Sequence, residues 1–273
     1  MSLPAVQAAA GSASGRGSVA GRSGPGGPGG AGGPGGAGGA GGNPAGAGRI
    51  ALVAGGSGLV GSALLPLLLA APEYTRVHAL SRRPLPLEHA RLANRVVRFD
   101  APLSLQLKGL ACHEAFCCLG TTRRAAGGEA GFRAVDHDLV LAFARLAVAA
   151  GTERLVIVSA VGANAHSKNF YLRTKGETEQ DLERLGLRAL DILQPSLLLG
   201  LRREIRSLEL GAQLALRAIG PLLRGRLAPW RPIEAHTVAA AMRGAARGGR
   251  LGVTRYTYTG MQRLAQLSRR TVS

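Results

Sequence analysis

Residues 54 to 61 read Ala54-Gly55-Gly56-Ser57-Gly58-Leu59-Val60-Gly61, and this stretch decides the fold because of what surrounds it. It directly follows the apolar run Ile50 to Ala54 and opens a helical pattern, so its glycines stand at a strand-to-helix turn. Glycine permits a tight turn and the close approach of a pyrophosphate, whose charge would lie on free N–H groups at the start of the helix. The predicted cofactor contacts of this turn are Gly55, Ser57, Gly58, Leu59, Val60 and Gly61.

From Arg49 onward, short apolar runs alternate with longer helical patterns, which is typical of a parallel sheet with crossover helices. The predicted strands are Ile50 to Ala54, Arg76 to Leu80, Arg95 to Phe99, Ala115 to Leu119, Arg154 to Ser159, Ala189 to Leu193 and Arg255 to Thr259. The predicted helices are Leu59 to Ala70, Phe132 to Ala150, Phe170 to Leu185, Glu204 to Ile219 and Ala235 to Ala246. The pattern predicts an α/β fold, a doubly wound parallel-sheet Rossmann domain with a small C-terminal extension on the substrate side.

The first 48 residues repeat Gly-Gly-Pro and Gly-Gly-Ala units and contain almost nothing that a core can use. We therefore expect a disordered leader over 1–48 and a single folded domain over 49–273. About 225 residues are enough to bury a core without disulfide or metal staples. A start codon assigned too far upstream is an alternative explanation of the leader.

The formal net charge is +18, carried by 31 arginines and three lysines. Such a balance indicates either an anionic partner or a GC-rich genome, and composition does not separate the two. We do not expect nucleic-acid binding, because no motif of a known nucleic-acid reader accompanies the charge. We also expect no membrane span, since no stretch approaches the roughly 20 apolar residues that a bilayer requires.

The three cysteines, Cys112, Cys117 and Cys118, match neither a disulfide framework nor a C-x-x-C spacing. We interpret them as small buried hydrophobic residues in a reducing compartment, with no metal site. The amino terminus lacks the continuous apolar segment of a secretory signal, so a cytoplasmic location is expected. Its Ser, Arg and Ala content without acids resembles a mitochondrial transit peptide, an alternative weakened by its few arginines and many glycines.

The end of the second predicted strand bears on the choice of cofactor. An NAD-specific site usually places a carboxylate there, to accept a hydrogen bond from the ribose 2′-hydroxyl. Here Ser81 is followed by Arg82 and Arg83, whose guanidiniums suit a 2′-phosphate, so NADP(H) is favoured over NAD(H). The alternative is two solvated loop arginines. Asp100, after the third strand, is expected to border the adenine.

Tyr171 and Lys175 form a Y-x-x-x-K pair, whose i, i+4 spacing places phenol and ammonium on one helix face. A neighbouring cation favours phenolate and lowers a tyrosine pKa, which makes the hydroxyl a usable proton donor to a carbonyl. Ser159 ends the fifth predicted strand and is expected to hydrogen-bond the substrate oxygen. The alternatives are a solvated surface pair and a serine that serves only the turn before Gly162.

Several strings carry a family resemblance. They are Phe116-Cys117-Cys118-Leu119-Gly120-Thr121-Thr122-Arg123, Gly131-Phe132, Val135-Asp136-His137-Asp138, and Tyr171 to Lys175 followed by Gly176-Glu177. In these the chain resembles an atypical short-chain dehydrogenase/reductase, close to the subgroup that contains the human Tat-interactive oxidoreductase-like protein. The likeness runs from about Arg49 to Arg206 and is fainter to Leu264.

The resemblance implies NADPH binding, with Tyr171 and Lys175 as the catalytic pair. The further cofactor contacts that it implies are Leu119 and Gly120 at the nicotinamide ribose, Pro195, Ser196 and Leu198 after the sixth strand, and Arg202. Two departures are Ser159-Ala160, where the subgroup tends to have paired serines, and Asp136, where many relatives have a structural asparagine. If the active hydroxyl belongs at 160, turnover is weak or absent.

Together these features predict an NADPH-dependent oxidoreductase that transfers hydride to an unidentified carbonyl-type substrate, with Ser159, Tyr171 and Lys175 as its site. The alternative is an NADPH-binding, redox-responsive regulatory or protein-interaction module with little or no turnover.

Overall fold

The computed structural model describes residues 48–199 and 225–269. The chain divides into two units, Met1–Pro44 and Ala45–Ser273, and every described residue belongs to the second. Residues 1–47 of the predicted leader, the helix expected over Glu204 to Ile219 and the expected cofactor contact Arg202 lie outside the described residues.

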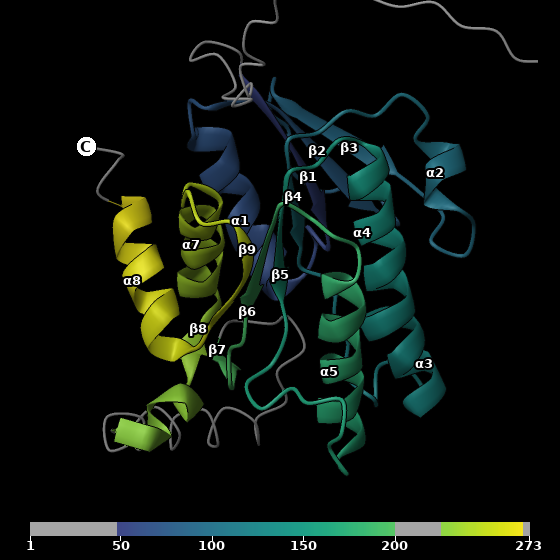
Figure 1. Cartoon of the computed structure of the whole chain (residues 1–273). Coiled ribbons are helices and arrows are strands. Elements are labelled where there is room, and N and C mark those ends of the chain that lie inside the picture. The colour runs from purple at the N-terminus through teal and green to yellow at the C-terminus, as the bar shows by residue number, and fades with distance from the viewer. Residues whose placement is uncertain (1–47, 200–224, 270–273) are drawn as a thin grey trace, which may run out of the picture. The chain divides into compact units, whose positions relative to one another are not determined.

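The described part is built on a parallel sheet of seven strands in the order β3-β2-β1-β4-β5-β6-β9 (Figure 1). The strands are β1 (Arg49–Ala54), β2 (Tyr74–Ser81), β3 (Leu92–Val96), β4 (Glu114–Cys117), β5 (Arg154–Val158), β6 (Ala189–Leu193) and β9 (Gly252–Tyr256). A second, two-stranded parallel sheet joins β7 (Leu198–Leu199) to β8 (Ile233–Glu234). The predicted doubly wound α/β fold is confirmed.

Helices cover both faces of the large sheet, as Figure 1 shows. One face carries α1 (Leu59–Ala70), α7 (Ala235–Ala246) and α8 (Tyr258–Arg269). The other carries α2 (Leu103–Gln106), α3 (Glu129–Arg133), the π-helix η1 (Ala134–Leu139), α4 (Val140–Ala149) and α5 (Phe170–Glu183). A short 3-10 helix, η3 (Gly225–Trp230), precedes β8. Within the described ranges, no helix is long and apolar enough to span a bilayer.

The alternation of side chains along β1 separates two hydrophobic cores. Ala51 and Val53 belong to the core under α1 and α7, whereas Leu52 and Ala54 belong to the core under α4. Both sets are fully buried, because every central strand of a doubly wound sheet is covered on both faces. The same arrangement brings the carboxyl ends of β1, β4, β5 and β6 to one edge of the sheet.

The predictions made from periodicity are accurate for α1, β6 and α7, whose bounds agree with the structure. The predicted strand over Arg255 to Thr259 is wrong beyond Tyr256, because α8 begins at Tyr258. Burial of Met261 and Ala265, one turn apart, stabilises α8 against α7. Gly244 permits this packing, since a Cβ there would lie 2.3 Å from the Leu264 carbonyl oxygen.

The bounds of β1, β2, β4, β5 and α5 differ from the prediction by one or two residues at an end, and two other elements differ more. The third strand is Leu92–Val96 rather than Arg95 to Phe99, because an edge strand is little buried and its apolar pattern is weak. The helix predicted over Phe132 to Ala150 is three segments, α3, η1 and α4, with the wider π-helical turns between the α-helical ones.

Candidate functional site

The glycine turn connects β1 to α1, and two of its three spaced glycines are required by packing alone. Gly55 has a φ of +81°, and a Cβ there would lie 2.5 Å from the Cys118 carbonyl oxygen. A Cβ at Gly61 would lie 2.1 Å from the Gly55 carbonyl oxygen. Neither position therefore accepts a side chain.

Gly58 is different, because its backbone is extended, with φ −78° and ψ 173°, which any residue adopts. A Cβ there would meet only the Gly55 oxygen at 3.2 Å and the Cys118 oxygen at 3.8 Å. Gly58 is the N-cap of α1 and no side chain caps that helix end. The Val60 side chain is buried and therefore not open to a ligand. What this turn offers to a ligand is its backbone N–H groups at the start of the helix.

The rim of the sheet beside this turn carries the other expected cofactor contacts. Arg82 and Arg83 follow β2 directly, are exposed and, in the part of the chain that the structure describes, have no hydrogen-bond or ion-pair partner. Asp100 is exposed and pairs with Arg98 at 2.9 Å, and that hydrogen bond lowers the pKa of Asp100. Leu119 and Gly120 follow β4 and lie at the rim, partly buried and exposed respectively.

The predicted catalytic pair lies on one face of α5. Asn169 caps this helix by accepting a hydrogen bond from the Leu172 N–H at 3.2 Å. Tyr171, in the first turn, is 38% exposed and its ring packs on Phe132, 5.4 Å between centroids. Lys175, one turn further, is only 6% exposed. The helix therefore holds the phenol at the surface and the ammonium beneath it.

Asp136, in the π-helix η1, is the partner of the buried lysine. Lys175 Nζ lies 2.7 Å from Asp136 Oδ1, and the backbone N–H of Thr121 donates to Oδ2 at 2.8 Å. Asp136 is 1% exposed, so both of its oxygens are occupied out of contact with solvent. One carboxylate thus joins the loop after β4 to α5 and matches the charge of Lys175. An asparagine at 136 has one side-chain oxygen and no charge, so it could neither accept at both positions nor match the charge of Lys175.

Lys175 lowers the Tyr171 pKa as expected, but burial of the phenol outweighs this effect. Burial lowers the pKa of Lys175, but the charge of Asp136, then Tyr171 and the hydrogen bond to Asp136, outweigh it and place the Lys175 pKa above 10.5. Burial raises the pKa of Tyr171, Lys175 lowers it and Asp136 raises it, with a net pKa above 10.0. The phenol therefore keeps its proton at neutral pH.

Ser159 follows β5 and is buried rather than open to the rim. Its hydroxyl donates to Glu179 Oε1 at 2.5 Å. Glu179 also accepts from Gln194 Nε2 at 2.9 Å and from Arg255 Nε at 2.9 Å. The neighbouring Ala160 is buried and has no hydroxyl. Ser159 must leave the Glu179 bond before it can reach a substrate oxygen.

The segment after β6 is held by its own contacts. The Pro195 carbonyl accepts from the Val161 N–H at 2.9 Å, and the Ser196 hydroxyl donates to the Arg231 carbonyl at 2.5 Å. Leu198 is partly buried and pairs with Ile233 in the small sheet. This segment lies after the carboxyl end of β6, on the same edge of the sheet as the glycine turn.

The sequence did not predict a role in the site for two of its residues, Glu179 and Asp136. Glu179 stands four residues after Lys175, so the i, i+4 spacing that marks Tyr171 and Lys175 extends to it and was the available signal. Asp136 has no such signal. It lies on another element, and only the packing of η1 against α5 brings it to Lys175.

No family model matches the chain. It is 37% identical to the protein HTATIP2 of Rattus norvegicus over 174 residues, which cover 62% of this chain and 70% of that protein. The chain belongs to the family of HTATIP2 and FMP52. It is 39% identical to FMP52 of Candida glabrata, over 56% of this chain and 66% of that protein. It is 34% identical to FMP52 of Coccidioides immitis, over 69% of this chain and 82% of that protein.

The solved structures that resemble this fold are more distant in sequence. The Bordetella bronchiseptica enzyme WbmG, in complex with NAD, has a TM-score of 0.57 and 15% identity, covering 85% of this chain and 80% of that one. A UDP-glucose 4-epimerase of Thermotoga maritima has a TM-score of 0.56 and 17% identity, covering 82% of each chain. The Rossmann fold and the resemblance to short-chain dehydrogenases/reductases are both confirmed.

The expected cytoplasmic location is corrected by the same relatives. The FMP52 proteins of Candida glabrata and Coccidioides immitis are both named as mitochondrial. The expectation rested on the lack of a secretory signal and on cysteines suited to a reducing compartment, and neither feature distinguishes the cytoplasm from the interior of an organelle where thiols are kept reduced.

Proposed function

We propose that this protein is an NADP(H)-dependent oxidoreductase that acts on a carbonyl-type substrate at the rim of α5. The observation that carries the proposal is the buried Lys175–Asp136 pair, one helical turn beneath the half-exposed phenol of Tyr171. A charged lysine is costly to bury unless it is paired, and here the paired cation lies under a group that can donate a proton. WbmG, a structural neighbour, is described in complex with NAD, which supports a nicotinamide cofactor.

The residues at the rim fit such a cofactor. Gly58 leaves open the space that a Cβ would fill, and the uncapped start of α1 offers N–H groups to a pyrophosphate. Leu119, Gly120, Pro195 and Leu198 lie beyond the same edge of the sheet and would border the rest of the molecule. A bound nicotinamide would supply the hydride.

The chain's own residues would manage the proton. Tyr171 keeps its proton because its pKa is raised, and it would donate that proton to the substrate oxygen. Lys175 would hold the nicotinamide ribose and favour the phenolate left behind, while Asp136 keeps Lys175 charged and in place. Ser159 would orient the substrate after exchanging its Glu179 bond for the substrate oxygen.

A second candidate function has its own observation. Because Glu179 holds the Ser159 hydroxyl and Ala160 has none, the described residues supply no free hydroxyl at the end of β5. This favours a module that binds NADPH and engages a protein partner with little turnover. Purified protein, NADPH and a panel of aldehydes, ketones and quinones separate the two functions. Oxidation of NADPH that depends on an acceptor supports the enzyme, and its absence with every acceptor supports the module.

Gly58→Val is expected to abolish binding of both NADPH and NADH while the protein still folds. Its side chain would enter the pyrophosphate path, while its backbone is already extended. Gly61→Ala is the control, and it is expected to lower the melting temperature because its Cβ would meet the Gly55 oxygen. Fluorescence titration and thermal melting measure the two effects. NADPH binding that survives Gly58→Val contradicts the proposed path.

The double variant Arg82→Ala/Arg83→Ala is expected to weaken NADPH by about 10- to 100-fold and NADH hardly at all, because only NADPH carries a 2′-phosphate. The double variant Arg263→Ala/Arg269→Ala removes the same charge from exposed positions on α8 and is expected to change neither affinity. Calorimetric titration of both cofactors measures this. Equal losses for NADPH and NADH would exclude a 2′-phosphate contact.

We also propose a mitochondrial location, on the strength of the fungal relatives' names. Fractionation of cells that express the full chain with a C-terminal epitope tests it. Recovery in the mitochondrial fraction, protected from added protease, is the expected result, and recovery in the cytosol alone overturns the proposal.

A further inference from the structure

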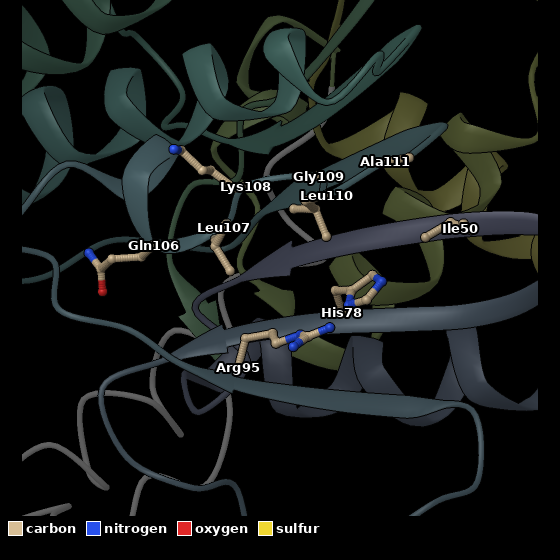
Figure 2. A pocket seen from close by; sticks show the side chains of 9 residues that line it. All are labelled: Ile50, His78, Arg95, Gln106, Leu107, Lys108, Gly109, Leu110 and Ala111. Atoms are coloured by element: carbon tan, nitrogen blue, oxygen red, sulfur yellow. The ribbon is translucent and has the colours of Figure 1, made fainter.

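A pocket of about 290 Å³ lies away from the proposed cofactor site, under the segment that leads from α2 to β4. Its floor is the outer part of the sheet, and its roof is the run 107–111 (Figure 2). None of its nine lining residues belongs to the glycine turn, to the loop after β4 or to α5. The lining residues are Ile50, His78, Arg95, Gln106, Leu107, Lys108, Gly109, Leu110 and Ala111.

His78 supplies a buried polar group that the described protein does not satisfy. The residue is 9% exposed, and its Nδ1 is buried without a hydrogen-bond partner. A buried polar atom without a partner is rare in folded proteins, and this nitrogen is closed to solvent, so a ligand in the pocket would meet the rest of the ring. Burial, then Arg95 and Arg76, lower the pKa of His78, so the ring is neutral at pH 7 and has one N–H to donate.

Arg95 supplies a cation at the mouth of the same pocket. It belongs to the edge strand β3 and pairs with Leu80 of β2. Leu80 lies two residues after His78 on β2, so Arg95 and His78 face the same side of the sheet. Figure 2 shows the two side chains next to each other. Arg95 is exposed, and within residues 48–199 and 225–269 no carboxylate or carbonyl pairs with it.

The rest of the lining is mainly apolar. Leu107 and Leu110 point toward His78, and Ile50 closes the far end (Figure 2). Lys108 and Gln106 border the pocket but point away from it, and Gln106 is engaged by the Arg98 backbone. The pocket thus combines a cation and a buried imidazole with hydrocarbon walls, and it contains no carboxylate.

We propose that this pocket binds a small organic carboxylate, with the carboxylate on Arg95 and the His78 ring and the hydrocarbon part against Leu107 and Leu110. An arginine fork matches a carboxylate, and the second ring nitrogen of His78 would donate its N–H to the same group, because Nδ1 is closed to solvent. The leucine walls favour an organic anion over inorganic phosphate, which needs donors on all sides. The volume is close to the lower limit of small-molecule sites, which restricts the ligand to a few carbon atoms.

The test uses the full chain with butyrate as the probe, followed by NMR signals of the histidine rings. Butyrate is expected to shift the His78 ring signal, identified by its loss in His78→Leu. Butyramide, which is neutral, and inorganic phosphate, which lacks the hydrocarbon, are expected to bind at least about tenfold more weakly. Phosphate binding as tight as that of butyrate, or a His78 signal that butyrate leaves unchanged, overturns the proposal.

Variants then locate the site. Arg95→Gln is expected to weaken butyrate binding by about tenfold or more, whereas Lys108→Gln removes the same charge from a side chain that points away and is expected to change nothing. His78→Leu is expected to lose binding without loss of thermal stability, because it removes an unpaired buried nitrogen. Equal effects of Arg95→Gln and Lys108→Gln contradict the assignment. Because these measurements use no nicotinamide cofactor, their outcome does not depend on the proposed reductase.

Discussion

Tyr171→Phe is expected to slow turnover by about 10²–10⁴-fold while NADPH still binds, because it removes the proton donor and keeps the ring. The ring packs on Phe132, so its shape is retained in the variant. Single-turnover kinetics with the acceptor found in the substrate panel measure the chemical step, and fluorescence titration measures NADPH binding. The control is Tyr258→Phe, which deletes a phenol hydroxyl on α8 and is expected to leave the rate unchanged.

A wild-type rate in Tyr171→Phe would exclude the reductase mechanism and leave the binding module as the function. Loss of NADPH binding together with turnover would instead show that the phenol holds the cofactor rather than donating a proton. Only a large loss of rate with unchanged binding agrees with the proposal.

Lys175→Met is expected to lower the free energy of unfolding by about 3–5 kcal/mol, because it leaves Asp136 buried and charged without its partner. The double variant Asp136→Leu/Lys175→Met removes both charges and is expected to recover much of the loss. Arg133→Met is the matched control. It breaks the partly exposed ion pair between Arg133 on α3 and Glu177 on α5, and is expected to cost about 1 kcal/mol or less.

Urea denaturation at pH 7 measures all three variants. Because the Lys175 pKa lies above 10.5 in the folded protein, the stabilisation by the pair is fully present below pH 10.5 and is lost as the pH rises through the folded pKa. Equal losses in the free energy of unfolding for Lys175→Met and Arg133→Met would show that the Lys175–Asp136 pair is not buried. A double variant as unstable as Lys175→Met would show that the lysine acts through packing and not through its charge.

Lys175→Met also tests the electrostatics of the phenol. Lys175 lowers the pKa of Tyr171, so its removal is expected to move that pKa further above 10.0. If activity is retained, its alkaline limit, where the phenol loses its proton, is expected to move to higher pH in a pH–rate profile. A shift to lower pH would contradict the arrangement.

Local pattern was sufficient for much of the fold. The bounds of α1 and α7 follow from helical periodicity, and β6 follows from a short apolar run between polar residues. Prediction failed at α8, whose first turn contains Tyr258 and Thr259, residue types that favour strands in isolation. It also misplaced β3, since an edge strand with exposed residues carries little apolar signal. In both cases packing against a neighbour, not local propensity, determined the element.

The sequence by itself determined the contacts that one element can make. The glycine turn and the Tyr171–Lys175 spacing are set by backbone geometry within a few residues, so both could be recognised from the order of residues alone. Only the tertiary structure decided the state of these groups. Asp136 holds Lys175 charged, Glu179 occupies the Ser159 hydroxyl, and β3 brings Arg95 to His78. Charge, burial and hydrogen bonding depend on residues that lie far apart along the chain, and only folding brings them within a few ångströms of one another.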